Sequence, residues 1–147
     1  MPEIEIKVKS PTFKEMEARY KKRAEELKVM KTPNKRIAIF LDRWVQLNFR
    51  TEGGNVGGWK PLALGGRFVD GILDTSAKIL QDTRVLQKSF LPFATNKNAG
   101  IGSDLDYAKP HEEGLNGLPR RRILPKNSEV RGDVKKLYTQ WVEGIMK

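Results

Sequence analysis

The chain has 147 residues, of which 31% are charged, and it contains no cysteine. This length suits one domain with a modest hydrophobic core. The lack of cysteine excludes disulfides and thiolate chemistry. No run of about 18 apolar residues occurs, so neither a membrane-spanning helix nor a membrane partner is expected.

The net charge of +10 is concentrated at the two ends of the chain. Residues 1–50 carry a net charge of +6 and residues 119–147 one of +5, whereas residues 51–118 carry −1. A basic excess of this kind favours an acidic partner, either a nucleic acid or an acidic protein surface. The charge does not distinguish between these two partners.

The first thirty residues predict an extended segment followed by a helix. Apolar and charged residues alternate between Ile4 and Lys9, which indicates an extended arm or edge strand over residues 1–10. Thr12 and Glu15 have the spacing of a capping box, and a helix is predicted over about 11–30. Its apolar stripe consists of Phe13, Met16, Tyr20, Ala24 and Leu27.

A second helix is predicted over about 34–51, after an interruption at Thr32-Pro33-Asn34. Its apolar arc is wider than that of the first helix, so we expect it to be more buried. Residues 53–66 are rich in glycine and predict a flexible loop, which lacks the Gly-Lys-Ser/Thr ending of a phosphate-binding P-loop. Trp59 in this loop packs either into the domain or against an interface.

The next forty residues predict a helix and then a hairpin. A third helical region is expected over residues 68–90, with Asp74 as its cap and Pro92 as its stop. A short β-hairpin is predicted around Asn96-Lys97-Asn98.

The rest of the chain predicts a short helix over residues 104–113, a loop over 114–125, and a last helix capped by Asn127 or Ser128. The predicted fold class is therefore α+β. Two helices at the N-terminal end and one at the C-terminal end are expected to pack around a small antiparallel β-sheet or hairpin. We expect a single domain over residues 1–147.

The only histidine, His111, precedes Glu112 and Glu113, and this cluster is the first candidate for chemistry. General acid–base catalysis needs a proton acceptor held near a substrate, but neighbouring residues on a short helix point in different directions. There is no second histidine to complete a zinc site, and the aspartates match no metal-binding loop. We therefore expect no catalytic residue, no metal and no cofactor, and a hydrolase that uses His111 is kept as an alternative.

Arg120, Arg121 and Arg122 are the second candidate. Guanidinium groups bind phosphates or carboxylates bidentately, although short charge runs are often simply solvated. No sequence-specific nucleic-acid-binding motif accompanies them, so any DNA contact would be made to the backbone. The candidate DNA-phosphate contacts are Arg120, Arg121, Arg122 and Lys126.

Several short motifs follow one another in a distinctive order over residues 45–125. They are Phe49, Trp59-Lys60-Pro61-Leu62, Lys78-Ile79-Leu80-Gln81-Asp82-Thr83, Leu86-x-x-Ser89, Ile101-Gly102, Tyr107-Ala108, His111-x-x-Gly114 and Leu118-Pro119-Arg120. In this order they resemble the phage virion morphogenesis family, the tail-completion or neck proteins of Mu-like and related tailed phages. The family usually has Thr-Gly before the Leu-x-x-Ser motif, whereas Arg84 follows Thr83 here, which suggests a continuous helix instead of a tight turn. Glu112 stands where the family often has glutamine.

The resemblance implies a structural protein and not an enzyme. It implies a small α+β subunit that forms a ring, commonly a hexamer, at the head–tail junction or at the tail end. The implied partners are copies of itself, phage neck, connector, tail-tube or sheath proteins, and packaged DNA in the lumen. The implied location is the virion neck or tail, and the host cytoplasm during assembly. Expected contact residues are Trp59, Pro61, Leu62, Tyr107, His111, Arg120, Arg121 and Arg122. A basic, non-specific nucleic-acid-binding module is the alternative function.

Overall fold

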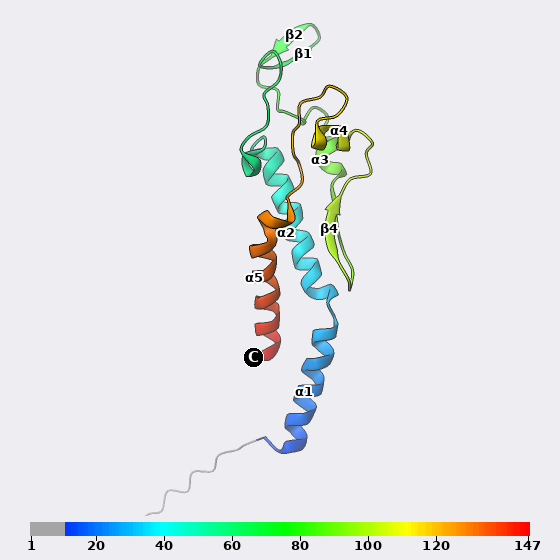
Figure 1. Ribbon diagram of the computed structural model, residues 1–147, viewed down its shortest axis with the longest axis vertical. Coiled ribbons are helices and arrows are strands. Elements are labelled where there is room, and N and C mark those ends of the chain that lie inside the picture. The colour runs from blue at the N-terminus through cyan, green and yellow to red at the C-terminus, as the bar shows by residue number, and fades with distance from the viewer. Residues whose placement is uncertain (1–10) are drawn as a thin grey trace, which may run out of the picture.

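The computed structural model describes residues 11–147 as an elongated α+β structure (Figure 1). The arm predicted over residues 1–10 lies outside the described residues. The elements are α1 (Phe13–Lys28), α2 (Lys31–Arg50), the 3₁₀ turn η1 (Gly54–Val56), β1 (Arg67–Val69), β2 (Ile72–Asp74), α3 (Val85–Ser89), β3 (Leu91–Ala94), β4 (Ala99–Gly102), α4 (Ala108–Glu113) and α5 (Asn127–Met146). The predicted fold class is confirmed, with two N-terminal helices, one C-terminal helix and two small antiparallel sheets.

Helix α1 begins with the capping box that the sequence predicts. The Thr12 hydroxyl accepts a hydrogen bond from the Glu15 backbone N–H (3.3 Å), and the Glu15 carboxylate accepts one from the Thr12 N–H (2.8 Å). No residue of α1 is buried; the helix contacts α5, and its N-terminal end extends beyond the other elements (Figure 1). The N-terminal part of its apolar stripe faces solvent, with Phe13 84% exposed and Tyr20 59% exposed, whereas Leu27 is partly buried.

Helix α2 begins earlier than predicted. The break between α1 and α2 falls at Val29 and Met30, and Pro33 lies inside the first turn of α2. A proline is tolerated there because the first N–H groups of a helix have no partner within it. The predicted interruption at Thr32-Pro33-Asn34 is therefore wrong by three residues.

Helix α2 is the central element, because both hydrophobic clusters of the structure include its residues. Near its N-terminal half, Ile37 and Leu41 pack with Val130 of α5, which runs antiparallel beside it (Figure 1). Its C-terminal half contributes to a larger cluster, which contains Val45, Phe49, Trp59, Ile79, Leu86, Phe90, Ala108 and Ile123. The greater burial expected of this helix from its wide apolar arc is confirmed.

The hairpin predicted around Asn96-Lys97-Asn98 is confirmed. Strand β3 pairs antiparallel with β4, and Ala94 lies opposite Ala99. The Asn34 side chain of α2 donates a hydrogen bond to the Thr95 carbonyl (2.7 Å) and accepts one from the Tyr138 hydroxyl of α5. One buried asparagine thereby joins the hairpin tip, α2 and α5.

Residues 68–90 do not form the predicted helix. Strands β1 and β2 form a hairpin whose two turn residues, Asp70 and Gly71, have φ values of 49° and 78°. Positive φ values at both positions are typical of a two-residue hairpin turn, and Asp-Gly is a favoured pair there. The Asp74 carboxylate accepts hydrogen bonds from the Ser76 N–H (2.9 Å) and hydroxyl (2.6 Å), so it closes a local turn instead of capping a helix.

Arg84 adopts a left-handed backbone conformation immediately before α3, with a φ of 57° and a ψ of 12°. Glycine adopts this conformation most easily, whereas residues with a Cβ atom are strained in it. The continuous helix expected through Thr83 and Arg84 is therefore wrong. A tight turn is present, with an arginine in it.

The predicted short helix is confirmed as α4, although it starts at Ala108, and residues 114–126 form the predicted irregular connection to α5. The first turn of α5 is held by the Glu129 carboxylate, which accepts a hydrogen bond from the Lys126 N–H (2.8 Å). None of the helices within residues 11–147 is long and apolar enough to cross a membrane.

Candidate functional site

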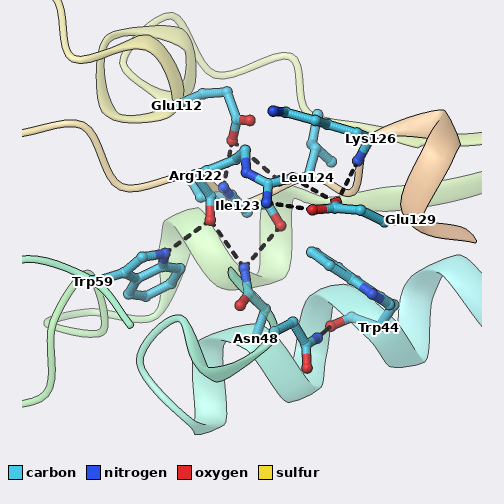
Figure 2. A network of polar contacts seen from close by, with 10 residues as sticks. Trp44, Asn48, Trp59, Glu112, Arg122, Ile123, Leu124, Lys126 and Glu129 are labelled. Atoms are coloured by element: carbon cyan, nitrogen blue, oxygen red, sulfur yellow. Dashed lines mark hydrogen bonds and ion pairs between the residues drawn. The ribbon is translucent and has the colours of Figure 1, made fainter. Parts of the chain in front are cut away.

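Residues 118–126, which we call the arginine segment, cross the C-terminal half of α2 between α4 and α5 (Figure 2). The Asn48 amide of α2 donates hydrogen bonds to the carbonyls of Arg122 (3.0 Å) and Ile123 (3.1 Å). The Trp59 indole N–H donates a third to the Arg122 carbonyl (2.8 Å). The backbone of the arginine segment is thus fixed against α2 and the glycine-rich loop.

Glu112 fixes the same segment from the opposite side. Its carboxylate Oε2 accepts hydrogen bonds from the backbone N–H groups of Ile123 and Leu124, the latter at 3.1 Å (Figure 2). Hydrogen bonds that involve an ionised carboxylate are stronger than neutral ones. Both acceptor bonds of Glu112 therefore serve the chain's own structure, which argues against its use as a catalytic base.

Arg121 points into the structure and is only 7% exposed. Its Nε donates to the Lys60 carbonyl (3.0 Å) and its Nη2 to the Pro61 carbonyl (3.2 Å), while its backbone N–H donates to the His111 carbonyl (2.8 Å). Burial lowers the pKa of this guanidinium. Arg121 ties the glycine-rich loop to the end of α4, and its guanidinium is turned away from any external phosphate.

Arg122 is held in a two-point ion pair with Glu129 of α5. Its Nη1 and Nη2 each lie 2.6 Å from one oxygen of the Glu129 carboxylate. The hydrogen bond from Arg122 and that from the Lys126 N–H lower the pKa of Glu129 to about 2, and the hydrogen bond to Glu129 raises the pKa of Arg122. The charge of Arg122 is therefore largely neutralised within the chain.

Arg120 and Lys126 are the two exposed members of the predicted DNA-phosphate set. The Arg120 Nε donates a hydrogen bond to the Glu112 carbonyl (3.2 Å), which leaves its other donors in solvent. Because Arg121 and Arg122 are engaged internally, the four basic residues do not form one anion-binding cluster. Of the four predicted phosphate contacts, Arg120 and Lys126 are exposed, Arg121 is buried and Arg122 is paired with Glu129.

Trp59 lies in the core and is only 7% exposed. Its ring contacts Phe49 edge-on, with a centroid distance of 5.3 Å and an interplanar angle of 84°. A Cβ atom on Gly53, which has a φ of 89°, would lie 2.4 Å from the Trp59 ring, so glycine is required for this close approach. Trp59 therefore packs into the domain, which is one of the two placements that the sequence left open.

Three of the expected contact residues, Leu62, Tyr107 and His111, line one hollow of about 230 Å³. Tyr107 and the neighbouring Pro61 are exposed, whereas Leu62 and His111 are partly buried. Burial, and then the positive charge of Arg121, lower the pKa of His111, which favours the neutral form of its imidazole. Its Nδ1 is buried without a hydrogen-bond partner among the described residues.

No group of three or more histidine, aspartate or glutamate side chains within residues 11–147 could hold a metal ion. Glu113, the other carboxylate beside His111, is exposed. The cluster at 111–113 therefore lacks a carboxylate that is both free and directed at the imidazole.

Asn48 is the residue of this network that the sequence reasoning missed. It is fully buried and lies on the apolar face of α2. An amide in the middle of an apolar arc needs hydrogen-bond partners, because an unpaired buried polar group is destabilising. The sequence shows this amide within an apolar arc, but the hydrogen-bond partners of Asn48 lie more than seventy positions away along the chain.

Comparison of the chain with protein-family models, curated protein sequences and solved structures finds no match.

Proposed function

We propose that the chain is a structural subunit of a tailed-phage virion that assembles into a ring at the head–tail junction or at the tail end. The observation that carries this proposal is the exposure of large apolar side chains at both ends of an elongated subunit. Helix α1 lies at one end and the β1–β2 hairpin at the other (Figure 1). An elongated subunit with exposed apolar side chains at each end suits a protein that binds a neighbour on either side.

The apolar side chains at these ends are too numerous to be incidental. On α1, Phe13, Met16 and Tyr20 are exposed. On the hairpin, Phe68 is 58% exposed and Ile72 is 74% exposed. Clustered exposed apolar residues mark interaction surfaces in soluble proteins. Contact between two unlike surfaces of one subunit generates a ring if the rotation closes and an open filament if it does not, and we propose the closed form.

The motifs behind the family resemblance also support the proposal. Phe49, Trp59, Ile79, Leu86 and Ala108 come from five of these motifs and belong to one buried cluster. Their order along the chain therefore reflects the way the chain packs. The left-handed turn at Arg84 lies where the family usually has glycine, which is the residue that such a turn favours.

The proposed role is non-catalytic, since the Glu112 carboxylate is committed to backbone hydrogen bonds and no carboxylate among the described residues is hydrogen-bonded to the His111 Nδ1. The proposed partners are further copies of the chain and neck, connector, tail-tube or sheath proteins. The proposed locations are the neck or tail of the virion, and the host cytoplasm while particles assemble.

Oligomer mass, measured by light scattering on a sizing column, tests the role of the α1 stripe. Replacing Phe13 and Tyr20 with serine should lower the mass of the assembly to that of smaller species without loss of helix content. Lys22→Ser with Glu26→Ser is the matched control, because both residues lie on the opposite face of α1 and the pair leaves the net charge unchanged. Equal effects of the two double variants would argue against the stripe as an interface.

Electron microscopy of particles made without this protein tests the virion role. We expect particles with unjoined heads and tails, or with tails of abnormal length, and few infectious particles. A normal yield of tailed, infectious particles would overturn the proposal.

A further inference from the structure

A basic groove lies between the C-terminal half of α2 and the segment that leads into α3. It has a volume of about 760 Å³. Arg43 and Arg50 of α2 line one side, and Lys78 and Arg84 line the other, with Asp42 as the single acidic residue in the lining. We call these residues, with the glutamines between them, the basic groove.

The three arginines of the basic groove are exposed and free of counter-charges. Among the residues that the structure describes, no carboxylate lies within ion-pair distance of Arg43, Arg50 or Arg84. Lys78 has only a loose contact with Glu52, at 3.8 Å. Like charges that face one hollow repel one another, so an anion bound there would relieve the repulsion.

The floor of the basic groove is held by amide side chains. The Gln87 Nε2 donates a hydrogen bond to the Gln46 Oε1 (2.8 Å), and the Gln81 Nε2 donates one to the Phe49 carbonyl (2.6 Å). These bonds fix the segment that carries Arg84 against α2. The two segments that carry the charged side chains are therefore joined to one another.

The backbone at Arg84 gives a second, independent indication. Its left-handed conformation would be adopted with less strain by glycine. Strained residues concentrate at functional sites, which makes the Arg84 side chain a candidate for a role in binding. The Arg84 side chain makes no hydrogen bond or ion pair to the described part of the chain, and it lines the groove.

We propose that the basic groove binds the sugar–phosphate backbone of double-stranded DNA without regard to base sequence. Leu47 is the only apolar residue in its lining, and no aromatic side chain lines it. Protein interfaces are centred on apolar and aromatic anchors, and single-stranded nucleic acids are bound by stacking on aromatic rings. A lining of guanidinium, ammonium and amide groups matches the phosphates of a duplex instead.

The spacing of the α2 arginines fits this ligand. Arg43 and Arg50 are seven residues apart, which places them on one face of the helix and about 10.5 Å apart along its axis. Both guanidinium groups can therefore face the phosphates of one duplex from the same side of the helix. This inference does not depend on ring assembly, because the groove is complete within one chain.

Binding of the full chain to a fluorescent 20-base-pair duplex, followed by anisotropy at several salt concentrations, tests the proposal. Four cationic contacts predict a log–log salt slope of about −3.6, and hence about 150-fold weaker binding at 200 mM than at 50 mM salt. Arg43→Gln with Arg50→Gln should weaken binding at least tenfold at 100 mM salt and make the slope shallower by about 1.8.

The matched control removes the same charge elsewhere. Arg131→Gln with Lys135→Gln changes two exposed basic residues of α5 and should alter the affinity less than twofold. A loss equal to that of the groove variant would overturn the proposal, because it would reflect net charge alone. Equally strong binding to poly-glutamate would also overturn it, since that result would indicate an acidic protein ligand.

Arg84→Gly separates binding from stability. The substitution removes one charge and relieves the backbone strain, so DNA affinity should fall about threefold or more while the melting temperature stays the same or rises. Unchanged affinity in a normally folded variant would count against the groove as the DNA site. This variant remains informative even if the α2 double variant folds poorly.

Discussion

Arg120, Arg121 and Arg122 follow one another in the chain, whereas Arg43, Arg50 and Arg84 come from two separate segments. In the folded chain the consecutive set is dispersed: Arg121 is buried against carbonyls, Arg122 is paired with Glu129, and only Arg120 is exposed. The separated set gathers in one groove, and no carboxylate among the described residues lies within ion-pair distance of any of them. Charge clustering along the sequence is thus a poor guide to charge clustering in space.

The difference has a physical origin in backbone geometry. Successive residues of an extended segment point to opposite sides, so the middle arginine, Arg121, is buried while its two neighbours are not. Residues seven apart on a helix lie on one face, and a segment packed against that face can add further charges. We therefore expect substitutions in the arginine segment to affect folding, and substitutions in the basic groove to affect binding.

The largest effect on stability is expected for Glu112→Ala. The change leaves two backbone N–H groups of the arginine segment without their carboxylate acceptor, which should lower the free energy of unfolding by about 3 kcal/mol. Urea denaturation followed by circular dichroism measures this loss. Glu113→Ala, at the exposed neighbour, should change stability by less than about 0.5 kcal/mol. Similar losses for both variants would show that Glu112 has no special structural role.

A somewhat smaller effect is expected for Arg121→Met. Methionine keeps much of the side-chain packing but removes the donors to the Lys60 and Pro61 carbonyls, so the free energy of unfolding should fall by about 2 kcal/mol. Arg120→Met should change it by less than about 0.5 kcal/mol. If the two variants were equally stable, the internal role assigned to Arg121 would be wrong.

The Arg122–Glu129 pair predicts a dependence of stability on pH. The pKa of Glu129 is lowered to about 2 in the folded chain, below its ordinary value of 4.5. A group with a lowered folded pKa stabilises the fold above its unfolded pKa, and this stabilisation is lost as the pH falls through the folded value. The melting temperature should therefore drop between about pH 4.5 and about pH 2. Glu129→Gln should make that part of the profile flatter, and an unchanged profile would contradict the prediction.

The smallest effect on stability is expected for Arg84→Gly. Relief of the left-handed strain at a residue with a Cβ atom favours the variant, whereas the greater freedom of glycine in the unfolded chain opposes it. The net change should lie between zero and a gain of about 1 kcal/mol. Thermal denaturation of the variant beside the parent measures it. A loss of more than about 1 kcal/mol would mean that the Arg84 side chain stabilises the fold, against the assignment of this residue to binding.

Local signals in the sequence predicted the local structures well. The capping box at Thr12 and Glu15, the hairpin around Asn96-Lys97-Asn98 and the apolar face of the last helix depend on residues close together in the chain. The helix predicted over residues 68–90 does not form, because the turn preference of local residues outweighs the helical spacing of the apolar ones. Asp70-Gly71 is a strong hairpin signal, and it competes with a helix at that point.

The candidate site was less predictable than the fold. Tyr107, His111 and Leu62 were singled out and do lie around one hollow, but the internal roles of Arg121 and Glu112 depend on partners far along the chain. Arg36, Arg43 and Arg50 recur every seven residues, which is a readable stripe on a helix. That stripe alone does not reveal a groove, since Lys78 and Arg84 reach it through a turn with a positive φ value.

By itself, the sequence determined the helices with capped ends and apolar faces, the β3–β4 hairpin, the basic character of the chain and its lack of thiol chemistry. These properties follow from residue type and short-range spacing, on which helix caps, tight turns and net charge depend. Only the tertiary structure decided which arginines are internal and which are free. That outcome depends on burial and on hydrogen bonds between residues many positions apart, such as those that join Asn48 and Trp59 to the Arg122 carbonyl.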